Sequence, residues 1–112
     1  MLGQIQKLGA QNKTEQLKSS KGLVAFWDFK EEAGQTRQAW GKGTFPLVEM
    51  DGTIPRRNEG PLSGYSAQFG SGAYLSLSSA QTGALNIYGP KQGVTVLAWV
   101  KWTGEQTGFV GG

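Results

Sequence analysis

Two segments constrain the fold of this chain most strongly, residues 22–29 (GLVAFWDF) and residues 94–102 (VTVLAWVKW). Both are dense in β-branched and aromatic residues and are flanked by glycine, which is typical of sheet strands. Alternate side chains of a strand point to opposite faces, and in both segments each face carries large apolar groups. A strand that is apolar on both faces needs cover on both. We therefore predict two central strands of a layered β structure, with Trp27 and Trp99 shielded above and below.

The composition narrows the chemistry that this chain can perform. Its 112 residues are enough for one domain, and they include no cysteine and no histidine. Disulfides and cysteine-based zinc sites are thereby excluded, and the usual general base near neutral pH is missing. These absences count against Ser/His, Cys/His and zinc-hydrolase mechanisms. Carboxylate chemistry and calcium binding stay open, because both need only oxygen ligands.

The net charge of +3 does not indicate a nucleic-acid-binding face. Residues 1–21 carry the whole excess, whereas from Gly22 onward seven basic residues balance seven acidic ones. The body is therefore neutral, and we predict no nucleic-acid partner. No stretch approaches the roughly 20 apolar residues of a membrane helix, so we predict no membrane insertion. The N-terminus lacks the apolar core of a secretion signal.

The chain divides at Gly22 into an arm and a body. Residues 1–21 contain no aromatic residue and are rich in Gln, Lys and Ser, which predicts a solvated linker with a short helix at about residues 14–19. Residues 22–112 alternate apolar runs with glycine-rich joints, as an all-β antiparallel sandwich or jelly roll does. Besides the two central strands, the predicted elements are a strand at 45–49, a hairpin of 65–69 with 73–77, a helical turn or extended piece at 84–87, a strand starting at 108, and loops at 30–43 and 51–64.

The order of these motifs resembles the concanavalin A-like lectin/glucanase superfamily, and more narrowly its laminin-G-like jelly rolls of large bacterial surface and secreted proteins. The resemblance rests on the opening LVAFWDF strand, on the hairpin pattern Phe69-Gly70-Ser71-Gly72 with Tyr74 and Leu75, and on the Ala98-Trp99-Val100 core of the later strand. It spans about residues 22–112.

The resemblance implies a secreted or cell-surface location within a multidomain protein. Because the family's domain is larger, we expect residues 22–112 to be its N-terminal portion, truncated at the C-terminus. Uncovered apolar faces and an open sheet edge would then lead to pairing with the rest of the domain or to self-association.

Three residues are candidates for ligand binding. Asp28 lies within an apolar strand, where it either accepts hydrogen bonds from loop amides or, as in many jelly rolls, ligates calcium, which is the only cofactor suggested. Trp40, in a polar loop, would serve as a stacking platform for a sugar, and Tyr88 is a lesser candidate together with Trp102. The other aromatic residues on predicted strands are assigned to the core: Phe26, Trp27, Phe69, Trp99 and Phe109.

We predict a non-catalytic module that binds a glycan or a protein. The alternatives are a fragment of a glucanase-like glycoside hydrolase with its carboxylates outside this chain, and a structural spacer. Glucanases of the superfamily carry a Glu–x–Asp–x–x–Glu strand motif. Glu49-Met50-Asp51 begins such a pattern, but Ile54 stands where the third acid belongs, and hydrolysis needs two carboxyls at a defined separation.

Overall fold

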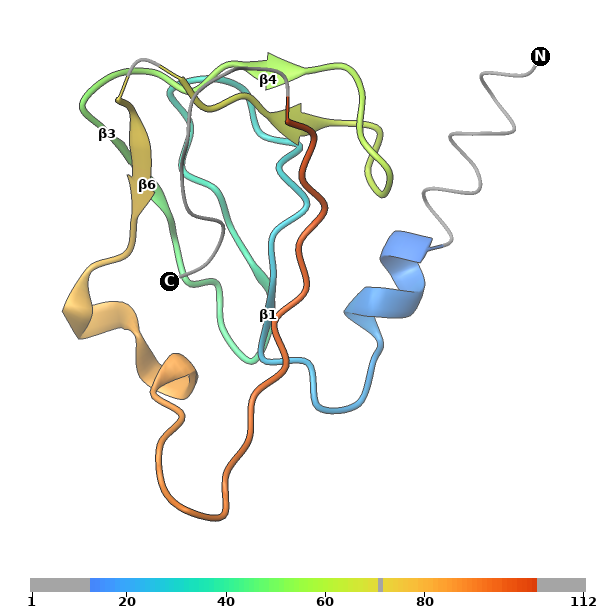
Figure 1. Ribbon diagram of the computed structural model, residues 1–112, viewed down its shortest axis with the longest axis vertical. Helices are drawn as coiled ribbons and strands as arrows, with labels where there is room; N and C mark the ends of the chain where they lie inside the picture. The colour runs from blue at the N-terminus through green and yellow to red at the C-terminus, as the bar shows by residue number, and fades with distance from the viewer. Residues whose placement is uncertain (1–12, 71, 103–112) are drawn as a thin grey trace.

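The computed structural model describes residues 13–70 and 72–102 (Figure 1). These residues form short strands in three two-stranded antiparallel sheets, with a helix at residues 13–18 and two 3₁₀ turns. The chain is therefore β-rich with little helix, as the sequence predicts. Each strand has only two or three residues, so loops make up most of the described chain.

The first sheet joins β1 (Ala25–Phe26) to β2 (Trp40–Gly41), with Phe26 opposite Trp40. The Lys42 amide extends the pairing by donating to the Val24 carbonyl at 2.9 Å. Gly41 permits this close approach, because its φ is +126° and a Cβ there would run into the Val24 carbonyl. The prediction of an unstructured loop over residues 30–43 is therefore wrong at β2. The polar, glycine-rich composition of these residues carries no alternating apolar pattern that would predict the strand.

The second sheet pairs β3 (Val48–Met50) with β6 (Tyr74–Ser76), and the third pairs β4 (Arg56–Arg57) with β5 (Ser66–Ala67). The predicted strands at 45–49, 65–69 and 73–77 are thus present in part. The predicted hairpin is wrong, because β5 and β6 pair with earlier strands and not with each other. The segment 51–64, predicted to be loop, supplies β4 as the partner of β5.

Two 3₁₀ turns follow β6, η1 (Ser79–Gln81) and η2 (Gly83–Leu85). The Ser78 hydroxyl caps η1 by accepting from the Ala80 amide at 3.4 Å. Of the two alternatives left open for residues 84–87, a helical turn or an extended piece, η2 supplies the helical turn up to Leu85.

The buried core of the described chain is small. Its apolar members are Ala39, Phe45, Ile54 and Leu62. The Trp27 ring packs against Phe45 with centroids 6.4 Å apart, and its indole N–H donates to the Phe45 carbonyl at 3.1 Å. Phe26 and Trp27 are half-buried, so their assignment to the interior holds in part.

Two other aromatic residues that the sequence assigns to the core are exposed, and a third lies outside the described residues. Phe69 is 55% exposed, and Trp99 is exposed to the same extent. The short strands β5 and β6 leave Phe69 at the start of a glycine-rich connection, beyond the reach of the core. Phe109 and the strand predicted from residue 108 lie outside the described residues.

The two predicted central strands are not covered on both faces. Residues 23–29 contribute only β1 to a sheet, and most of this segment is half-buried. Residues 94–102 are exposed throughout and form no strand. They run as an extended trace beside β1, drawn in orange to red in Figure 1. The prediction that this segment is a shielded central strand is wrong, because no other described segment pairs with its backbone or covers its outer side.

The N-terminal arm also differs from the prediction of a solvated linker. Residues 13–18 form the short helix expected at about 14–19. Thr14 is buried, however, and the ammonium group of Lys18 lies over the Trp40 ring on β2. This part of the arm therefore packs on the body. Residues 1–12 lie outside the described chain.

Candidate functional site

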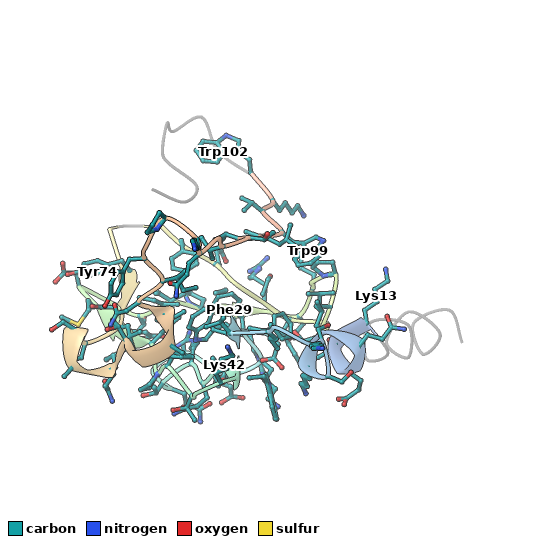
Figure 2. The ribbon with its side chains drawn as sticks, turned by 90° about the horizontal axis from the view of Figure 1, so that it is seen from below. Lys13, Phe29, Lys42, Tyr74, Trp99 and Trp102 are labelled. Carbon is teal, nitrogen blue, oxygen red and sulfur yellow. The ribbon has the colours of Figure 1, made fainter. Side chains whose placement is uncertain are left out.

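Half of the exposed large apolar side chains of the described chain lie on residues 94–102. We call this surface the apolar row, and it consists of Val94, Val96, Leu97, Ala98, Trp99, Val100 and Trp102. All seven side chains are exposed, Val96 to 79%. Trp102 projects away from the rest of the described chain in Figure 2. Contiguous apolar exposure of this kind marks an interaction surface rather than ordinary solvent contact.

The backbone of the apolar row is also available for hydrogen bonding within the described chain. Among the hydrogen bonds within residues 13–70 and 72–102, none joins the backbone of residues 93–102 to another backbone group. The segment has one ion pair, between Lys101 and Glu59 at 3.4 Å, and both side chains are exposed. An exposed pair of this type contributes little to stability. The segment thus presents a series of backbone donors and acceptors beside apolar side chains.

An apolar cleft of about 710 Å³ separates the apolar row from the segment that contains β1. One wall carries Leu23, Ala25 and Trp27, the other carries Val96 and Leu97, and most of the lining is apolar. The two segments that the sequence singles out as strands therefore face each other across a space and not across a packed layer. Apolar clefts are frequent places for binding sites.

Asp28 is buried near the end of the segment that contains β1. It is only 6% exposed, and one carboxylate oxygen accepts from the Lys30 amide at 3.4 Å. The Ser63 hydroxyl donates to the Asp28 carbonyl at 2.7 Å. This is the loop-amide arrangement named above as one of the two interpretations of Asp28. In the described part of the chain no group of three or more acidic, histidine or cysteine side chains is placed to hold a metal ion, so a calcium ion at Asp28 would need backbone carbonyl ligands, and its binding there stays a prediction.

Trp40 lies on β2 and is 40% exposed. The Lys18 ammonium lies over its ring, 3.9 Å from the ring centroid, and the Lys30 ammonium is 5.2 Å from it. These cation–π contacts tie the helix and the loop after β1 to the sheet. A neutral sugar stacking on Trp40 would have to displace Lys18 from the ring face that Lys18 covers. No local pattern predicts that these two lysines contact Trp40, because they lie 22 and 10 positions before it.

Tyr88, the other ligand-binding candidate, is 82% exposed on the turn after η2. Its amide donates to the Gln92 side chain at 3.1 Å, which fixes the turn and leaves the ring in solvent. The structure brings Tyr88 and Trp40 into no common site. Among the weaker aromatic candidates, Trp102 alone belongs to the apolar row.

Glu49, the first acid of the partial glucanase motif, is engaged in a buried ion pair. Its carboxylate lies 2.7 Å from the Arg37 guanidinium, and Arg37 is 1% exposed. The Gly34 amide also donates to Glu49, at 2.9 Å. This backbone hydrogen bond is the main reason that the pKa of Glu49 lies below its ordinary value, and Arg37 adds to the effect against the opposing influence of burial. A carboxyl held ionised in this way is unsuited to act as a general acid.

No family model, curated protein or solved structure matches this chain. No helix among residues 13–70 and 72–102 is long and apolar enough to cross a membrane.

Proposed function

We propose that this chain is a non-catalytic interaction module, of the laminin-G-like β-sandwich type that the sequence resembles, and that it binds an extended polypeptide strand along the apolar row. One observation carries the proposal: residues 94–102 expose their apolar side chains, and no backbone group of residues 13–70 or 72–102 pairs with their backbone. An open strand edge of this kind is a template for pairing with another strand.

A polypeptide strand can both form hydrogen bonds with the backbone of residues 94–102 and cover their apolar side chains. Its amides and carbonyls pair with the backbone of residues 94–102, and its alternate side chains cover Val96 and Trp99 or enter the apolar cleft. A glycan would form a less regular set of hydrogen bonds with the backbone of residues 94–102, and it would leave the apolar row exposed to water. The Lys18 ammonium over Trp40 also weighs against a neutral sugar at the site where the sequence suggested one. We therefore favour a protein partner over a carbohydrate.

The sandwich interpretation is compatible with strand addition. In a layered β structure the segments 22–29 and 94–102 would have neighbours on both sides, and in the described chain each has an open side. An added strand supplies one of the missing neighbours. A hydrolase role is not supported by Glu49, because that carboxylate is bound to Arg37.

Calorimetric titration with a capped, soluble peptide of alternating valine and threonine tests the proposal. We expect binding, and we expect the same peptide N-methylated at alternate residues to bind at least about tenfold more weakly, because it cannot donate to the Val96 and Ala98 carbonyls or their neighbours. If the unmethylated peptide does not bind, the proposal is wrong and the structural-spacer alternative is favoured. Equal binding of both peptides would show that the backbone of residues 94–102 is not the recognition element.

A further inference from the structure

We propose that the strand bound along the apolar row is the apolar row of a second copy of this chain, in an antiparallel pair with its two-fold axis at Ala98. This inference rests on the proposed function and names the partner. It follows from the amino-acid pattern of the segment, its charge and the area that it exposes.

The pattern of the segment favours one register. When two copies pair antiparallel about Ala98, the whole of residues 94–102 overlaps, and side chains on the same face meet. Val96 then lies opposite Val100, and Leu97 lies opposite Trp99. At the ends of the pair, Val94 meets Trp102. Aromatic, aliphatic and β-branched side chains directly opposite one another stabilise antiparallel strands.

A shift of one residue would be worse. It would place the Lys101 ammonium opposite Val94 and mix the uniformly apolar face with the face that holds Thr95 and Lys101. In the register centred on Ala98, each Lys101 lies opposite Thr95 of the other copy, and the two lysines are far apart along the pair.

Charge does not oppose the association. Residues 93–102 contain Lys101 as their one charged side chain, and the body from Gly22 onward is balanced between seven basic and seven acidic residues. Two copies therefore approach without strong repulsion between their bodies. A segment of high β propensity, little charge and no proline also has the composition that pairs with copies of itself.

The exposed area sets the upper limit of what a pair can bury. The six largest side chains of the apolar row are 55% to 79% exposed. This corresponds to roughly 700 Å² per copy over both faces of the segment, against the ~800 Å² that each partner buries in a complex of standard size, and pairing along the edge covers part of it. Val48 and Met50 are also exposed, but they stand on β3, whose backbone is already paired with β6. The apolar row is thus the better-suited surface.

Variants that introduce a charge at the proposed axis provide the test. Their dimerisation is measured by sedimentation velocity over a range of concentrations. We expect the unmodified chain to dimerise. In Ala98→Glu two carboxylates meet at the axis, and in Ala98→Lys two ammonium groups meet, so each variant alone should dimerise at least about tenfold more weakly. An equimolar mixture of the two variants should restore the dimer, because opposite charges then face each other. Ala98 is exposed, so neither variant disturbs the core.

The matched controls are Ala80→Glu and Ala80→Lys on η1, where the alanine is also exposed. Both should dimerise like the unmodified chain. A monomer at all concentrations, or a dimer unaffected by either Ala98 variant, would overturn the inference. If the chain is monomeric and still binds the valine–threonine peptide, the self-pairing is wrong and the proposed function stands. If it also fails to bind the peptide, both are wrong.

Discussion

At the scale of single residues, the Arg37 guanidinium is buried and makes several hydrogen bonds, although its Nε has no hydrogen-bond partner among the described residues. It donates to the Glu49 carboxylate at 2.7 Å, to the Ile54 carbonyl at 2.8 Å and to the Gln35 carbonyl. These bonds connect β3 to the loops on either side of it. Nothing in the sequence around Arg37 distinguishes this arginine from a solvated one, because its partners lie 12 and 17 positions further along the chain. The pair was therefore not predictable from local pattern.

This ion pair gives the chain a specific dependence on pH. The pKa of Glu49 is lower in the folded chain than its ordinary value of 4.5, mainly because the Gly34 amide donates to it. Such a carboxyl stabilises the folded state above its unfolded pKa, and the stabilisation is lost as the pH falls through the folded value. We expect the melting temperature to fall as the pH is lowered from about 6 to 3, and we expect the fall to be smaller in Glu49→Gln.

Calorimetric melts across that pH range measure the effect. Glu59→Gln is the matched control, because Glu59 is exposed and makes only the surface pair with Lys101. It should keep the full pH dependence. Identical pH profiles for Glu49→Gln and the unmodified chain would show that the pair with Arg37 does not stabilise the fold.

At the scale of elements, the sequence predicts strand-forming segments better than strand pairing. Alternation and β propensity placed strands near β3, β5 and β6, and glycine with proline placed the turns. Pairing depends on contacts between distant segments, and the Gly70-Ser71-Gly72 joint suggested a hairpin that does not form. β2 and β4 were missed for a related reason. They consist of Trp-Gly and Arg-Arg, which carry no strand pattern and become strands through their partners.

Gly41 provides a test of the β1–β2 pairing. A Cβ at this position would collide with the Val24 carbonyl, and φ is +126°. We expect Gly41→Ala to lower the free energy of unfolding by about 1–3 kcal/mol more than Gly34→Ala does. Gly34 is the matched control, since its φ is also positive, at +85°, while a Cβ there would meet open space. Chemical denaturation of the two variants gives the comparison, and equal losses would contradict the packing of β1 on β2.

At the scale of the whole molecule, the sequence and the structure agree on a β-rich chain and differ on where the apolar surface goes. The amino-acid pattern of residues 94–102 predicts a strand with cover on both faces, and the structure leaves the same residues open along a cleft of about 710 Å³. Residues 94–102 are therefore exposed, and the shielded strand is not present among the described residues. The candidate site is apolar surface whose backbone pairs with no other backbone group in the part of the chain that the structure describes, and neither Trp40 nor Tyr88 belongs to it. The pattern of apolar residues shows that a segment can be buried, but it does not show which other segment packs on it. The sequence alone therefore does not predict that residues 94–102 are exposed.

Hydrogen–deuterium exchange of the amides in residues 94–102 tests the central claim most directly. In dilute, monomeric solution we expect these amides to exchange about as fast as those of an unstructured peptide, because no described backbone group pairs with them. After addition of the valine–threonine peptide, or at concentrations where the chain dimerises, they should become protected while the amides of η1 and η2 stay unchanged. Strong protection already in the dilute monomer would mean that residues 94–102 are paired within one chain, and the proposed binding surface would not exist.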